Sequence, residues 1–202
     1  GQEASDQIVT RLHDKRWDVV RNLVVLLRQM GDPSVLKPLG HLVGYANSKV
    51  QFEVMRTFLH FNDPRADRYL LKELGSNDNA TIVGAARLAA KSKSAEVACR
   101  LTEILNRKQR LDKDESVRKA VLKALAEMAH PGALPGLERF LLNRGLLKSL
   151  QGKDLKLEAV KVLSQYEAPA AAALAHKVQQ KYSGELSREA GTVYMQLTGG
   201  PS

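Results

Sequence analysis

Cysteine is nearly absent from this sequence, because the 202 residues include only Cys99. A single cysteine excludes an intramolecular disulfide framework and is typical of a reducing compartment, so we expect a cytoplasmic protein. No stretch of about 18 apolar residues occurs, and we expect no membrane span. The chain begins at Gly1 and without methionine. We therefore expect a trimmed chain or a fragment, in which the absence of a signal peptide says little.

Catalytic and metal-binding patterns are missing as well. Cys99 lies among the apolar residues of 97–101, so we expect a buried side chain rather than a nucleophile with a histidine partner. No histidine is spaced from another histidine or from the cysteine as metal ligands are; the five are His13, His41, His60, His130 and His176. The sequence predicts no enzyme activity, no metal site and no cofactor.

A turn signal recurs along the chain. Six segments end in an apolar-x-x-apolar pattern, most weakly in the third, and their last residues are 31, 31, 36, 38 and 31 positions apart: Met30, Phe61, Ser92, Met128, Tyr166 and Leu197. Proline follows five of the six ends: Pro33, Pro64, Pro131, Pro169 and Pro201. Proline is tolerated in the first turn of a helix, so each proline is interpreted as opening a further helix.

The apolar positions between these turns fall at helical spacing, and no alternating β-branched run indicates a strand. One hairpin cannot bury its apolar face alone, whereas stacked hairpins form a continuous core. We predict an all-α protein, a single-domain (1–202) right-handed α-solenoid of about six hairpins with a capping helix at each end. The hairpins are expected at about 4–30, 33–61, 64–92, 95–128, 131–166 and 169–197.

Two segments carry a family resemblance. Residues 117–125 (VRKAVLKAL) and 155–163 (LKLEAVKVL) resemble the second-helix motif of HEAT repeats, and are most similar to the short bacterial type called phycobilisome-lyase-like. In the first repeat, Arg16-Trp17, Arg21-Asn22 and Gly31-Asp32-Pro33 look like the same bacterial group. The resemblance covers nearly the whole chain and implies a solenoid whose second helices line the concave side. It is specific for fold and not for function, since such repeats mostly bind many unrelated partners.

Positive charge is in excess, with 31 lysines and arginines against 22 acidic residues and a net charge of +9. This balance favours an acidic protein, nucleic acid or an anionic membrane surface as partner, or simply serves solubility. One repeat position on the second helices is occupied by Val25, Arg56, Arg87, Lys123, Lys161 and Thr192. The four cations of this column, which we call the basic stripe, are the predicted partner-binding residues. The alternative is that each is simply solvated or paired with a turn carboxylate of the adjacent repeat.

The two longer repeats carry extra residues between their helices, at 106–115 and 143–154. Both insertions are rich in cations, and these form a possible secondary binding surface: Arg107, Lys108, Arg110, Arg144 and Lys148. The second insertion adds Leu146, Leu147 and Leu150, so it is either a docking loop or an extended first helix whose leucines pack on the neighbouring repeat.

Trp17 is the only tryptophan, and it stands near Arg21 and Asn22 at the start of the first closing helix. Exposed tryptophan and arginine are typical interface anchors, so these three residues complete the possible secondary surface. A buried Trp17 that closes the end of the core is the favoured alternative, with Arg21 and Asn22 bracing the adjoining turn. Glu53, Glu158 and Glu189 recur at one repeat position and are interpreted as structural.

These patterns predict a non-catalytic scaffold or adaptor that binds an acidic protein through the basic stripe. The alternative is sequence-independent binding of the nucleic-acid backbone by the same residues. Aromatic content of only 5% argues against base stacking along the stripe. A third reading is a fragment whose function lies in flanking domains. The sequence gives no prediction of oligomeric state.

Overall fold

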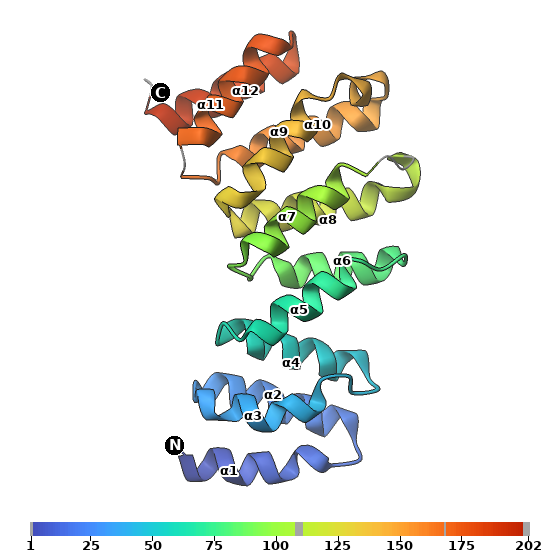
Figure 1. Ribbon diagram of the computed structural model, residues 1–202, viewed down its shortest axis with the longest axis vertical. Helices are drawn as coiled ribbons and strands as arrows, with labels where there is room; N and C mark the ends of the chain where they lie inside the picture. The colour runs from blue at the N-terminus through green and yellow to red at the C-terminus, as the bar shows by residue number, and fades with distance from the viewer. Residues whose placement is uncertain (1, 108–110, 168, 200–202) are drawn as a thin grey trace. The chain divides into compact units, whose positions relative to one another are not determined.

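The computed structural model describes residues 2–107, 111–167 and 169–199, and within these ranges it contains helices and no strand (Figure 1). The side chains of 2–4, 6, 111–114, 146 and 148 lie outside the described part. The chain divides into two compact units, 1–69 and 70–202, which we describe separately. The prediction of a single domain over 1–202 stays a prediction.

Unit 1 consists of short hairpins. Its α-helices are α1 (Gln2–Thr10), α2 (Trp17–Met30), α3 (Leu36–Leu39) and α4 (Ser48–His60). Short 3₁₀ turns join them: η1 (Arg11–His13), η2 (Pro33–Val35) and η3 (Gly40–Leu42). The two second helices, α2 and α4, pack on each other. Helix α5 (Pro64–Glu73) then runs across the division between the units.

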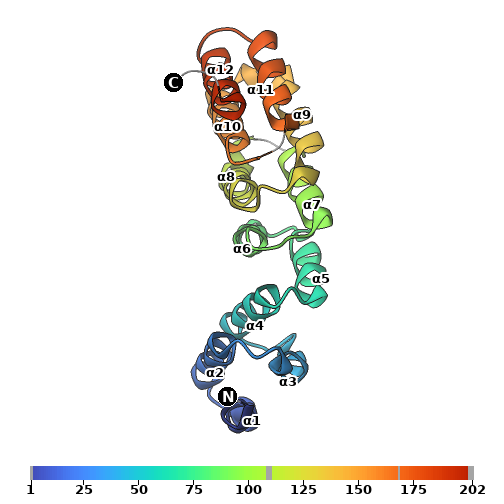
Figure 2. The ribbon, with the colours of Figure 1, turned by 90° about the vertical axis from the view of Figure 1, so that its left-hand side faces the viewer.

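Unit 2 continues the alternation of first and second helices. Its elements are α6 (Asn79–Ala89), α7 (Ala95–Leu105), α8 (Leu111–Met128), η4 (Pro131–Ala133), α9 (Leu134–Leu142), η5 (Arg144–Lys148), α10 (Leu150–Leu163), α11 (Pro169–Lys181) and α12 (Glu185–Thr198). Second helices α6, α8, α10 and α12 form one layer and first helices α7, α9 and α11 the other (Figure 2). The predicted all-α fold, an α-solenoid of helical hairpins, is confirmed in the described residues.

Local sequence sets the helix starts. Side-chain oxygens of Asp32, Asn47, Asp78 and Ser94 each accept a hydrogen bond from a backbone N–H in the first turn that follows. Gly31, with φ at +72°, ends α2 in the left-handed conformation that glycine adopts without strain. The turn signals in the sequence therefore correspond to real caps.

Close packing between α7 and α9 depends on one small residue. A Cβ atom added to Gly136 would overlap the side chain of Thr102. The Asn106 amide donates to the carbonyl oxygens of Thr102, at 2.8 Å, and of Gly136, at 2.9 Å. Glycine thus brings two neighbouring first helices close enough for one side chain to bond both backbones.

The residues of the two insertions do not extend the first helices. The alternative of an extended first helix was therefore wrong. Helix α7 ends at Leu105, and 111–115 instead lengthen the second helix α8 at its start. In the other insertion, α9 ends at Leu142 and a 3₁₀ turn, η5, leads to α10. Leu150 is 77% exposed, so it does not pack down on a neighbouring repeat.

Candidate binding surfaces

Trp17 is exposed, at 38% of its full surface, so the favoured expectation of a buried tryptophan was wrong. The residue opens α2, whose inward positions are Val20, Val24 and Leu27, and a side chain at the first residue of a helix can lie beyond the core. The Lys49 ammonium group of α4 lies 5.0 Å from the centre of the Trp17 ring, within range of a cation–π interaction.

A second aromatic residue accompanies a cation on α4. Phe52 is 36% exposed, and the Arg56 guanidinium lies 5.8 Å from its ring centre. Lys49, Phe52 and Arg56 are three or four residues apart and so share one side of the helix. We call Trp17, Lys49, Phe52 and Arg56 the aromatic–cation cluster of unit 1.

The first member of the basic stripe has a carboxylate partner. Glu53 is only 5% exposed and accepts from Arg28 of α2 at 2.7 Å and from Arg56 at 3.4 Å. The partner of Arg56 lies on its own helix and not in a turn of the adjacent repeat. The Arg28–Glu53 contact joins the two second helices, as expected for a structural carboxylate, whereas Glu158 at the same repeat position is exposed.

Arg21 and Asn22 bond each other rather than the adjoining turn. An Arg21 guanidinium nitrogen donates to Oδ1 of Asn22 at 3.4 Å, a long hydrogen bond between neighbouring side chains. Arg21 is half-buried and Asn22 exposed. Their predicted role in partner binding stays a prediction.

The other three stripe residues, Arg87, Lys123 and Lys161, are exposed on α6, α8 and α10 of unit 2. The described ion pairs include none of them. Their helices pack in succession, so equivalent positions repeat at about 8–10 Å. Their role in binding a partner stays a prediction.

Carboxylates lie beside this stripe. Lys119 pairs with Glu115 at 2.7 Å, and Lys91 pairs with Glu127 at 3.5 Å. The Glu115 carboxylate, with Glu158 and Asp154 further away, raises the pKa of Lys119. The second-helix layer of unit 2 therefore carries carboxylates as well as the cations of the stripe. Sequence analysis assigned Glu158 a structural role and did not consider Glu115 or Glu127.

The cations of the first insertion serve the fold where they are described. The half-buried Arg107 side chain donates to the carbonyl oxygen of Leu74 at 3.4 Å. Its own carbonyl oxygen accepts from Arg118 at 2.8 Å. Lys108 and Arg110 lie outside the described residues, as does the side chain of Lys148.

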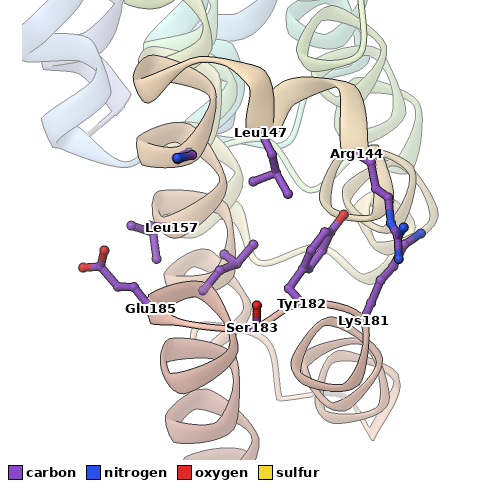
Figure 3. A pocket seen from close by; sticks show the side chains of 9 residues that line it. Arg144, Leu147, Leu157, Lys181, Tyr182, Ser183 and Glu185 are labelled. Carbon is purple, nitrogen blue, oxygen red and sulfur yellow. The ribbon is translucent and has the colours of Figure 1, made fainter.

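Arg144 borders a pocket of about 680 Å³ within unit 2 (Figure 3). The pocket lies between η5, the first half of α10, the end of α11 and the start of α12. Its lining residues are Arg144, Leu147, Lys153, Leu157, Lys181, Tyr182, Ser183, Glu185 and Leu186.

A buried lysine adjoins this pocket through the shared Tyr182. Lys156 of α10 is fully buried, and its ammonium group donates to the carbonyl oxygen of Leu141 at 2.6 Å and to the Tyr182 hydroxyl at 2.8 Å. The Tyr182 hydroxyl in turn donates to Leu141 at 2.9 Å, while Lys181 donates to the carbonyl oxygen of Leu142 at 2.9 Å. The last carbonyls of α9 are thus held by three side chains.

Burial, and to a lesser extent the positive charge of Lys181, lowers the pKa of Lys156 to about 8. Sequence analysis overlooked this residue. The signal was available, because Lys156 falls among the inward positions Leu155, Ala159 and Val160 of an amphipathic helix, where a lysine is unexpected.

Cys99 is exposed, so the expectation of a buried side chain was wrong. Its Sγ lies 3.5 Å from the carbonyl oxygen of Gly132. The described part of the chain contains no group of three or more histidine, cysteine, aspartate or glutamate residues that could hold a metal ion. Among the described helices, none is both long and apolar enough to cross a bilayer.

No family model and no curated protein matches the chain. One similar solved structure is human deoxyhypusine hydroxylase in complex with glycerol, at 14% sequence identity and a TM-score of 0.47. The similarity covers 98% of this chain and 86% of the other. A likeness this distant supports no inference about activity. The HEAT-like arrangement therefore rests on the helical hairpins themselves.

Proposed function

We propose that the protein is a non-catalytic scaffold or adaptor that binds another protein through the exposed faces of its second helices. The aromatic–cation cluster of unit 1 is the main support. Tryptophan and arginine are enriched among residues that dominate binding energy, and Trp17 and Phe52 each stand exposed beside a cation. In unit 2, Arg87, Lys123 and Lys161 provide steering towards acidic groups.

The mixed charge of unit 2 favours a protein partner over nucleic acid. Glu115, Glu127 and Glu158 lie on the same second-helix layer as the stripe and would repel phosphates. A protein can place cations opposite these carboxylates and carboxylates opposite the stripe, so that both signs contribute to specificity.

Nucleic-acid binding is the second candidate, and the same cluster supports it. Aromatic rings next to cations bind single strands by stacking on bases while the cations contact phosphates. Trp17 with Lys49 and Phe52 with Arg56 provide two such places.

The repeat subtype and the cellular location are also part of this proposal. We place the repeats in the short, phycobilisome-lyase-like bacterial HEAT subtype on the motif of 117–125 and 155–163. A cytoplasmic location agrees with one exposed, unpaired cysteine.

The test compares two variants with equal loss of charge. The site variant changes Arg56, Arg87, Lys123 and Lys161 to glutamine, and the control variant changes four exposed first-helix cations, Lys37, Arg68, Lys72 and Arg139. Both are used to capture proteins from an extract of the source organism, with identification of the captured proteins by mass spectrometry. We expect a partner that the unmodified protein and the control variant retain and the site variant loses.

Fluorescence anisotropy with labelled single-stranded and duplex nucleic acid at several salt concentrations addresses the second candidate. Four phosphate contacts on duplex DNA predict a log–log salt slope of about −3.6. Steep, salt-dependent binding that the site variant loses would replace the protein proposal. Equal capture by both variants would refute the assignment of the binding face.

A further inference from the structure

The pocket of unit 2 combines an apolar lining with an excess of positive charge. Leu147, Leu157 and Leu186 provide aliphatic surface, and the Tyr182 ring adds an aromatic wall. Arg144, Lys153 and Lys181 contribute three cations against one carboxylate, Glu185. A volume of about 680 Å³ is within the usual range for small-molecule sites.

The charges are distributed unevenly around the pocket. Arg144 and Lys181 lie together at one end, next to Tyr182, and Glu185 lies at the opposite side (Figure 3). The described ion pairs include none of the three lining cations and not the buried Lys156. The three lining cations therefore have no ion-pair partner among the described residues.

A purely structural role explains only part of this arrangement. Lys156 and Lys181 hold the last carbonyls of α9, which is a favourable place for cations at a helix end. Arg144 and Lys153 form no described hydrogen bond or ion pair, and both are exposed at the pocket. Arg144 lies with Lys181 beside this capped helix end (Figure 3), and a bound anion would relieve the repulsion between their positive charges.

We propose that this pocket binds a small organic anion with an apolar body, namely a carboxylate that carries an alkyl or aryl tail. The carboxylate lies at the end formed by Arg144 and Lys181. The tail lies along Leu147, Leu157 and Leu186. This site is separate from the second-helix faces and does not depend on the proposed scaffold function.

The experiment titrates the protein with octanoate and follows the methyl NMR signals of the three lining leucines. Three probes isolate the two chemical requirements: octanol has the tail without charge, octylamine has the tail with opposite charge, and acetate has the charge without the tail. We expect saturable shifts with octanoate and affinities at least about fivefold lower for the other three.

Two double variants test whether the cations that line the pocket contribute to binding. The pocket variant is Arg144→Gln with Lys153→Gln, which removes the two lining cations that form no described hydrogen bond. The control is Arg139→Gln with Arg188→Gln, exposed cations of α9 and α12 outside the pocket. We expect the pocket variant to bind octanoate about five- to twentyfold more weakly and the control to bind it as the unmodified protein does. All four replaced side chains are exposed, so circular dichroism should show both variants folded.

Three outcomes would overturn the proposal. Octanol binding as tightly as octanoate would show an apolar pocket without anion preference. Unchanged octanoate affinity in the pocket variant would show that Arg144 and Lys153 do not contribute to binding. An absence of leucine shifts with every probe would show that the pocket takes no ligand of this class.

Discussion

Replacement of Lys156 by methionine is expected to stabilise the protein near neutral pH and to change how stability depends on pH. The ammonium group is fully buried and its two described partners, a carbonyl oxygen and a phenol, carry no formal charge. Methionine keeps the length and flexibility of the side chain without the charge. The carbonyl oxygen of Leu141 keeps a donor in the variant, because the Tyr182 hydroxyl also bonds it.

The magnitude follows from the pKa of Lys156. A folded-state value of about 8, against an ordinary value of 10.5, corresponds to a penalty of about 3 kcal/mol for keeping the group protonated in the fold. The lowered pKa means that the unfolded chain binds more protons between these values, so stability rises with pH across that window. Loss of two hydrogen bonds, at about 1 kcal/mol each, leaves a net gain of about 1 kcal/mol near pH 7 for the variant.

The assay is urea unfolding of both proteins at several pH values. Trp17 fluorescence reports on unit 1, so the far-UV circular dichroism of the helices is the signal to follow. Both proteins contain every other titratable group, so the comparison reports mainly on Lys156. The advantage of the variant should shrink by about 2 kcal/mol between pH 7 and about pH 9.5. A difference that stays constant with pH would refute the assignment of a buried, perturbed ammonium group.

Three further predictions concern a buried carboxylate, two glycines and the exposed tryptophan. Glu53→Gln should lower the free energy of unfolding by about 2 kcal/mol, because it leaves Arg28 and Arg56 without their shared carboxylate. Glu158→Gln, at the exposed equivalent position, should change the free energy of unfolding by less than about 0.5 kcal/mol, and equal effects of the two variants in thermal melts would contradict this. Gly84→Ala should stabilise the protein by about 1 kcal/mol, since nothing lies within 4 Å of the added Cβ atom. Gly136→Ala should destabilise the protein by about 1–3 kcal/mol, because the added Cβ atom overlaps Thr102. Urea titrations that rank the two variants in the reverse order would contradict the described packing around these glycines. Acrylamide should quench Trp17 in the free protein and less in a complex formed through the aromatic–cation cluster, so unchanged quenching in such a complex would exclude Trp17 from the interface.

The repeat architecture was predictable because turn chemistry and apolar spacing are local properties. Pro64 and Pro169 begin helices, as predicted, and Pro33 and Pro131 begin 3₁₀ turns instead. The boundary errors at the insertions arose because α8 recruits residues that the sequence pattern left between helices, where helix propensity alone does not decide.

Side-chain environments were much less predictable. Cys99 was expected to be buried because its neighbours are apolar, and Trp17 because it would close the end of the core. Burial depends instead on which face of a helix meets the adjacent repeat, and both side chains are exposed. The pairing of Arg28 with Glu53 and of Lys156 with Tyr182 depends on contacts between different helices, which a pattern within one helix does not show. The pocket at Arg144 has the same origin, since it is assembled from four elements that no single repeat contains.

The division of the chain at residue 69 places its one tryptophan and its one cysteine in different units. Both side chains are exposed, so a thiol-reactive dye that absorbs tryptophan emission can be attached at Cys99 without any prior mutation. Energy transfer from Trp17 to such a dye would then report on the distance between these two residues. The unmodified sequence therefore already provides a donor in one unit and a labelling site in the other, with which a change in that distance can be followed when a ligand or partner is added.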